Sequence, residues 1–155
     1  MRIAIVGAGA MGLRVAEELL ASSSDVAMLA IDASHDSVSK FEKELADDRV
    51  KVAVEDANEI EHLAAALQGA NVVVNSAQYD VNRQVMNAAL KAGVHYIDLG
   101  GMFHETRRQL KLHDVFRKAG ITALLGMGAA PGVTNILVAH ACADFETVES
   151  VEASF

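Results

Sequence analysis

Three glycines near the N-terminus have the spacing of a phosphate-binding turn. They lie in the segment GAGAMG, directly after the apolar run from Arg2 to Val6. Gly7 permits a tight turn, the missing Cβ of Gly9 lets a pyrophosphate approach the backbone, and Gly12 allows a following helix to pack closely. The free N–H groups that begin this helix point at the phosphates. The residues predicted to bind a dinucleotide here are Gly7, Ala8, Gly9, Ala10, Met11 and Gly12.

An acidic residue ends the next apolar run, about 20 residues after the last glycine. This residue, Asp32, can accept hydrogen bonds from the hydroxyls of an adenosine ribose. It also repels a 2′-phosphate, so NAD is predicted as the cofactor in preference to NADP. Ala33 and Ser34 extend the binding region. NADP stays open as an alternative because Ser34 and His35 could contact a phosphate, although the next basic residue is Lys40.

Apolar strands alternate with amphipathic helices along the first 128 residues. Strands are predicted to end at Asp32 and to span residues 2–6, 50–54, 71–77, 95–99 and 121–125. Helices are predicted to begin near Met11 and to span residues 38–45, 59–68, 81–92 and 112–119, several of them ended by a glycine. This alternation predicts an α/β fold of the Rossmann type, with a doubly wound parallel sheet of about six strands and right-handed crossovers.

Further candidate residues follow the strands. Asp56 and Ala57 close the third strand, at the end that borders the adenine in such folds. Tyr79 follows the carboxyl end of the fourth strand, where open α/β sheets bind ligands; packing on a helix is the alternative. Asp98 ends the fifth strand and could orient a substrate amine or cap the next turn.

The pattern changes after Gly128. The only proline, Pro131, lies in GMGAAPGVTN, and a helix is predicted over residues 133–143. In VESVEASF, residues 148–155, apolar and polar side chains alternate, which is typical of an antiparallel strand with one wet face. Because this alternation is unfinished, we expect residues 1–128 to be a complete domain and residues 129–155 to begin a truncated second α+β domain.

Composition restricts the class of partner. The chain has 155 residues, of which 52% are hydrophobic, and its formal net charge is −8. This charge disfavours nucleic acids and anionic membranes as partners and favours a small molecule. An N-terminus without a targeting signal, the lack of a membrane-length apolar run and a single cysteine predict a soluble cytoplasmic protein.

Neither the cysteine nor the histidines indicate a metal or a reactive thiol. Cys142 lies in an apolar helical run, so a small buried side chain is expected. His95, His104 and His140 lack a recognised ligand spacing. No metal is predicted.

Long segments of the chain resemble the saccharopine dehydrogenase-like NAD(P)-binding proteins, which include lysine dehydrogenases. The resemblance is carried by GAGAMG, by SAQYDVNRQVMNAALKAGVHYIDLGG and by AGITALLGMGAAPGVTNILVAH, and it covers nearly the whole chain. It implies an NAD(P)-dependent oxidoreductase that acts on the C–N bond of an amino-acid or opine-like substrate such as lysine or saccharopine. One difference is Gln78, because many relatives have proline before the tyrosine that corresponds to Tyr79.

The resemblance also implies roles for single residues. Asn75, Ser76 and Ala77 match the loop on the nicotinamide side, and Asn135 matches a turn near the nicotinamide or substrate. The catalytic candidates are Tyr79, Asp98, His113 and Asp114; for the last two the alternative is a solvated helix face. Family members complete the substrate site and a homodimer with a second, mixed-sheet domain, so this chain alone is expected to bind cofactor without turnover.

Two other classes of protein share this beginning. One is a nucleotide-sensing regulatory domain of the potassium-transport type, which binds NAD or ATP without chemistry; the APGVTN turn and the unfinished strand argue against it. The other is a short-chain-dehydrogenase-like NADP protein, which is disfavoured by its different glycine spacing and because the chain has no Tyr-x-x-x-Lys pair.

Overall fold

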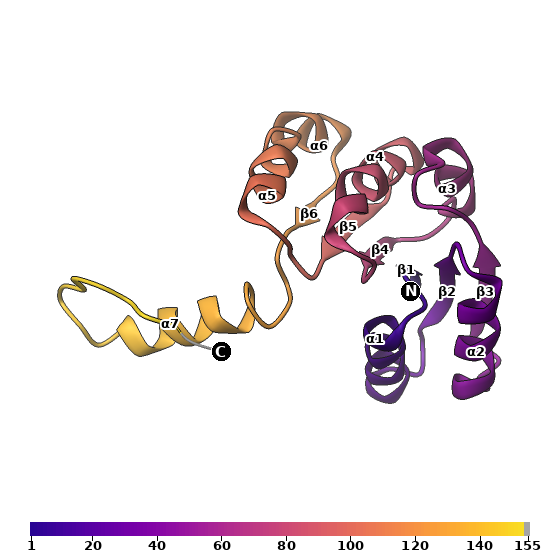
Figure 1. The fold of residues 1–155 in the computed structure, drawn as a ribbon, viewed down its shortest axis with the longest axis horizontal. Coiled ribbons are helices and arrows are strands. Elements are labelled where there is room, and N and C mark those ends of the chain that lie inside the picture. Colours follow the sequence, from indigo (N-terminus) through magenta and orange to yellow (C-terminus); the bar gives the residue numbers. More distant parts are fainter. Residues whose placement is uncertain (154–155) are drawn as a thin grey trace.

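A computed structural model describes residues 1–153 and contains one parallel sheet (Figure 1). The strands lie in the order β3-β2-β1-β4-β5-β6. Their bounds are β1 Arg2–Val6, β2 Ala27–Asp32, β3 Val50–Val54, β4 Val72–Asn75, β5 His95–Asp98 and β6 Ala123–Leu124. The helices are α1 Ala10–Ser22, α2 His35–Leu45, α3 Ile60–Ala66, α4 Asn82–Ala92, α5 Phe103–Leu110, α6 His113–Ala119 and α7 Val133–Cys142. The predicted doubly wound α/β fold is confirmed.

Alternate residues of the central strands supply the two halves of the core. On one face, Ile3 and Ile5 of β1 pack with Ala16 of α1 and Phe41 of α2. On the other face, side chains of β1, β2 and β4 pack with α3, α4 and α6, through a cluster that includes Ala4, Val6, Ile31, Val73, Leu63, Val85, Met86 and Phe116. Because all strands are parallel, their carboxyl ends meet at one edge of the sheet, where the predicted ligand residues lie.

Most predicted elements are present, with shifted bounds. Helix α2 begins at His35, earlier than predicted, because the Ser34 hydroxyl accepts a hydrogen bond from the Ser37 N–H and caps the helix. Strand β6, predicted over residues 121–125, is limited to Ala123–Leu124 at the sheet edge. The helical spacing of Leu112, Val115, Phe116 and Ala119 predicts one buried apolar stripe, but Val115 is 49% exposed, whereas Phe116 beside it is buried.

Helix α5 was not predicted, because its buried residues are polar. Glu105 and Gln109 face the core, so the helix has no apolar stripe. The Glu105 carboxylate accepts hydrogen bonds from Nε of Arg83 at 2.7 Å and from a guanidinium nitrogen of Arg108 at 3.2 Å. The hydrogen bond from Arg83, more than that from Arg108, lowers the pKa of Glu105 below its ordinary value. This ion pair fastens α5 to α4.

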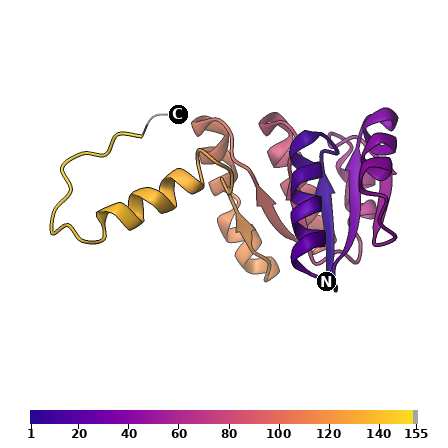
Figure 2. The ribbon, with the colours of Figure 1, turned by 90° about the horizontal axis from the view of Figure 1, so that it is seen from below.

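Helix α7 extends away from the sheet on the side of β6 (Figures 1 and 2). None of the residues described over Val133–Cys142 is buried, and Cys142 itself is half-buried, so the prediction of a buried thiol is wrong. The predicted strand is also wrong for residues 148–153, which have no strand structure, and its last two residues lie outside the described part. A strand requires a hydrogen-bonding neighbour, and residues 1–153 place none beside this segment. No helix in the described chain is long and apolar enough to cross a membrane.

Candidate cofactor site

The glycine turn between β1 and α1 contains glycines of two kinds. Gly7 has φ +97°, and a Cβ there would lie 2.6 Å from the amide nitrogen of Ala77. A Cβ on Gly12 would collide with the carbonyl oxygen of Gly7. Around Gly9, in contrast, nothing lies within 4 Å of the Cβ position. The fold itself therefore requires Gly7 and Gly12, whereas the space at Gly9 is free for a ligand.

The start of α1 presents backbone N–H groups at this space. Gly9 is the N-cap residue, and no side chain caps the helix. The first N–H groups of a helix lack partners within the helix, and its dipole places partial positive charge there. This geometry fits a pyrophosphate group.

Asp32 is fixed beside the glycine turn. One carboxylate oxygen accepts a hydrogen bond from the N–H of Ala8 and the other from the N–H of Ser34, each at 2.9 Å. Two backbone donors hold the carboxylate in one orientation. The side chains of Ser34 and His35 are engaged with α2, since Ser34 caps it and His35 Nδ1 lies 3.3 Å from the Ser39 hydroxyl.

A hollow of about 290 Å³ lies at the carboxyl ends of β1, β2 and β3, under the loop that follows β4. We refer to it as the Asp32 hollow. The predicted residues that line it are Gly7, Asp32, Ala33, Asp56, Ala57 and Ala77. The sequence interpretation missed Val6, Glu55, Gln78, Asp80 and Val81, which also line it. Val6, Glu55 and Gln78 lie at or directly beside predicted strand ends, which was the available signal, whereas Asp80 and Val81 lie three and four residues beyond one.

The residues at the end of β4 mainly support the turn. The Ser76 hydroxyl lies 2.9 Å from the carbonyl oxygen of Gly7 and donates to it. The buried Asn75 accepts from the Ala77 N–H at 3.2 Å and donates to Oδ1 of Asn82 at 2.8 Å. The Nδ2 of Asn82 is buried and has no partner among the described residues. Asn75 and Ser76 thus position Ala77 at the hollow, and their role near the nicotinamide remains a prediction.

Asp98 is the most heavily hydrogen-bonded candidate. One oxygen accepts from the N–H groups of Gly100 at 2.9 Å and Gly126 at 2.7 Å. The other accepts from the Tyr96 hydroxyl at 3.0 Å and from Nε2 of Gln109 at 2.6 Å. Burial, and secondly the charge of Asp98, raises the pKa of Tyr96. These contacts correspond to the turn-capping alternative, and a catalytic role for Asp98 stays a prediction.

Tyr79 lies near the Asp32 hollow but does not line it. It begins a short 3₁₀ helix, Tyr79–Val81, and its side chain is 41% exposed. Its Cβ lies so close to Gly101 that a Cβ there would collide with it. Tyr79 is therefore partly exposed near the carboxyl ends of the strands and also packs against the loop that contains Gly101. Its catalytic role remains a prediction.

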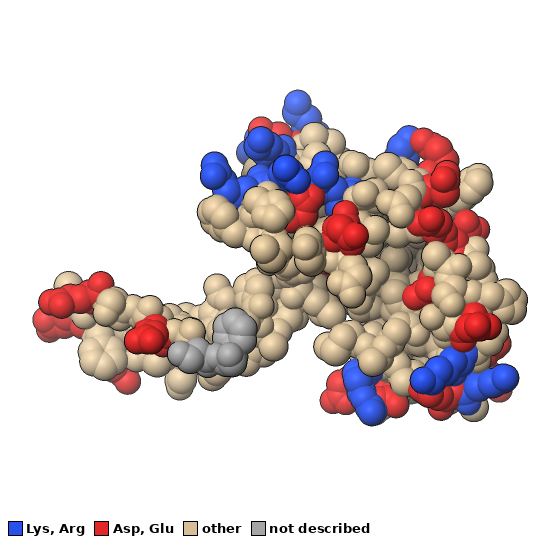
Figure 3. Space-filling view, in the orientation of Figure 1, with Lys and Arg blue, Asp and Glu red and all other residues tan. Residues whose placement is uncertain are grey.

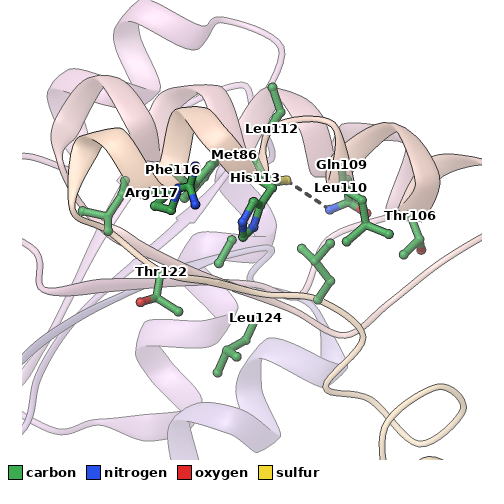
Figure 4. Close-up of a pocket in the computed structure, with 13 residues that line it drawn as sticks. Met86, Thr106, Gln109, Leu110, Leu112, His113, Phe116, Arg117, Thr122 and Leu124 are labelled. Carbon is green, nitrogen blue, oxygen red and sulfur yellow. Dashed lines mark hydrogen bonds between the residues drawn. The ribbon is translucent and has the colours of Figure 1, made fainter.

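The structure does not bring the other three candidates to this hollow. His113 lines a separate hollow of about 560 Å³ between α5, α6 and β6, together with Gln109, Phe116 and Leu124 (Figure 4). Asp114 is exposed and pairs with Arg117 at 3.0 Å. Asn135 accepts a hydrogen bond from the N–H of Gly132 at the start of α7. Their functional roles stay predictions.

No group of three or more His, Cys, Asp or Glu side chains within residues 1–153 is arranged to hold a metal ion. The ring of His95 has a structural partner instead, because its Nδ1 accepts a hydrogen bond from the N–H of Thr122 at 2.9 Å.

The sequence of this chain is similar to a family of known proteins. Residues 3–124 match the family model described as "Saccharopine dehydrogenase NADP binding domain". A carboxyaminopropylagmatine dehydrogenase from Synechocystis is 31% identical over 148 residues, which cover 90% of this chain and 37% of that protein. A carboxynorspermidine synthase from Vibrio cholerae is 28% identical, over 98% of this chain and 42% of that protein. The chain thus spans about two fifths of the length of these relatives.

Solved structures support the same fold. A saccharopine dehydrogenase (L-Glu forming) from Saccharomyces cerevisiae superposes with a TM-score of 0.79 at 18% identity, over 92% of this chain and 31% of that one. An NADPH-dependent quinone oxidoreductase from Escherichia coli, in complex with NADPH, superposes with a TM-score of 0.59 at 22% identity, over 79% of this chain and 47% of that one. At these identities the likeness concerns the fold alone.

Proposed function

The chain belongs to the saccharopine dehydrogenase NADP-binding-domain family, and from this membership we propose that it is the cofactor-binding part of an NAD(P)-dependent dehydrogenase. The observation that carries the proposal is the open space at Gly9 beside the uncapped start of α1. There the backbone N–H groups bind the pyrophosphate, and Asp32 accepts hydrogen bonds from the adenosine ribose. None of the relatives described above is named as a regulatory domain.

The proposed substrate class is an amine linked to a carbon skeleton with a carboxylate, as in amino acids, opines and carboxylated polyamines. The names of the Synechocystis and Vibrio relatives support the carboxylated polyamines in particular. When bound, a nicotinamide accepts hydride from the carbon of the C–N bond, or returns it in the reverse direction. The protein binds, orients and shields the reactants. Lysine or saccharopine as substrate and a homodimeric assembly remain predictions.

NAD is the proposed cofactor in preference to NADP. Asp32 is held by two backbone amides at the point where the ribose hydroxyls would lie. The side chains of Ser34 and His35 both make their hydrogen bonds to residues of α2. A fixed carboxylate favours a hydroxyl donor over a phosphate.

Titration calorimetry of the chain with NAD and with NADP tests this proposal. We expect NAD to bind more tightly, and Asp32→Ala to weaken NAD binding about tenfold or more, because hydrogen bonds to a charged group are lost. Asp144→Asn, a change of an exposed acid beyond α7, is the matched control and should bind as the parent does. Failure of both dinucleotides to bind would refute the proposed function.

A further inference from the structure

Four carboxylates line the Asp32 hollow. Asp32 comes from the end of β2, Glu55 and Asp56 follow β3, and Asp80 lies in the 3₁₀ helix after β4. No Lys or Arg is among the described residues that line the hollow, and none of the ion pairs within residues 1–153 involves these four acids. The hollow where the adenosine is proposed to bind is therefore strongly negative.

The four carboxylates differ in the hydrogen bonds that they accept from the protein. Asp32 is held by two amides, and Asp56 accepts hydrogen bonds from the N–H and the side-chain amide of Asn58 at 2.8 and 2.9 Å. The carboxylates of the half-buried Glu55 and the exposed Asp80 make no hydrogen bond to described residues. Their charges have no structural partner to neutralise them.

We infer that Glu55 and Asp80 are specificity-determining residues that act with Asp32 to exclude a phosphate at the adenosine ribose, so that this chain selects NAD within a family named for NADP. The inference rests on the proposed function and extends it from one residue to a surface formed by three segments. A phosphate monoester carries about −1.5 to −2 charges at pH 7. Each carboxylate therefore repels NADP more than NAD, which has no charge at this position.

The nearby basic residues do not offset this charge. A smaller hollow of about 230 Å³ is lined by Ala8, Gly9 and Ala10 of the glycine turn and by Lys40 of α2. Lys40 is paired with Glu44 at 3.6 Å. Many of the other Lys and Arg side chains gather over α5 and α6, at the β6 end of the sheet (Figure 3).

The test is the ratio of NADP to NAD dissociation constants, measured by calorimetry for the parent chain and for Glu55→Gln and Asp80→Asn. Each variant should lower the ratio about two- to sixfold. The larger value is the Coulomb effect of one carboxylate on a phosphate about one Debye length away in water, and the smaller value is that effect after screening by salt. The combined variant should lower it further. Raising the ionic strength should lower the ratio in the parent chain and have less effect in the combined variant.

The controls are Glu18→Gln on α1 and Asp144→Asn, both exposed acids outside the hollow, which should leave the ratio unchanged. NAD binding with an unaltered ratio in Glu55→Gln and Asp80→Asn would overturn the inference alone, and Asp32 would then account for selectivity. Tighter binding of NADP than of NAD by the parent chain would overturn it as well and point to Lys40. Absence of binding by either dinucleotide would overturn the proposed function together with the inference.

Discussion

At Gly9 the requirements of binding and folding can be separated. A Cβ at this position meets nothing in the protein, and the backbone angles, φ −84° and ψ −167°, are open to alanine. Gly9→Ala should therefore weaken dinucleotide binding about tenfold or more, because the methyl group occupies the space of the pyrophosphate, while the free energy of unfolding changes by less than about 1 kcal/mol. Calorimetry and thermal denaturation measure the two effects.

Gly12→Ala is the contrasting variant, because its Cβ would collide with the carbonyl oxygen of Gly7. It should lower both the stability and the affinity. Unchanged affinity in a folded Gly9→Ala protein would contradict the binding geometry assigned to the turn.

The sequence identified residues of the site whose function depends on local spacing, and it missed those that depend on tertiary position. The three glycines and Asp32 lie within one strand–helix–strand unit, so their spacing was sufficient to predict their arrangement. Glu55 and Asp80 reach the same hollow from later segments. For Asp98, the alternative of turn capping could be stated, but two of its donors, Gly126 and Gln109, are brought to it only by the fold.

At the level of elements, the attachment of α5 depends on pH. Glu105 is buried, with a side chain 5% exposed, and its pKa is lowered from an ordinary value of 4.5 by the hydrogen bond from Arg83. A group whose pKa falls on folding contributes stability above its unfolded pKa and loses it as the pH falls through the folded value. Glu105→Gln should thus destabilise the fold by about 1–3 kcal/mol at pH 7, and by less at pH values below 4.5.

Urea denaturation of the parent chain and of Glu105→Gln at several pH values checks this expectation. Glu18→Gln, which removes an exposed carboxylate from α1, serves as the matched control and should have little effect at any pH. A difference between Glu105→Gln and the parent that stays constant down to the lowest pH would show that packing, not charge, attaches α5.

Helix α5 also shows where periodicity fails. Apolar stripes predicted α1 and α3, and cap residues before a charged segment predicted α2, whereas α5 buries only the carboxylate of Glu105 and the amide of Gln109. The C-terminal alternation failed for the opposite reason: the pattern of a strand is present in residues 148–153, but within the described chain no neighbouring strand pairs with it.

At the scale of the whole molecule, the sheet and its helices should be stable without α7. The predicted domain boundary lies at residue 128, but the ring of Pro131 packs against Gly100 and Gly126, with ring carbons 3.0 Å from the Cβ position of Gly100. A chain that ends at Gly132 should therefore keep the melting temperature of the full chain within a few degrees. A chain that ends at Gly128 loses this packing and should melt at a lower temperature.

Differential scanning calorimetry of the three lengths distinguishes these outcomes. A large loss of stability on removal of residues 133–155 would mean that α7 stabilises the sheet, contrary to its lack of buried residues in the described structure.

The sheet order has a consequence for how the chain folds as it leaves the ribosome. Strand β1 precedes the other strands of the sheet in the sequence, yet it lies at the centre of the sheet, where Ile3 pairs with Val72 of β4 on one side and with Met28 of β2 on the other. The β1–β2 pair can form early, but the other edge of β1 stays open until β4 has been synthesised. An unpaired apolar edge is a template for aggregation. The growing chain is therefore most prone to aggregation between the emergence of β2 and that of β4.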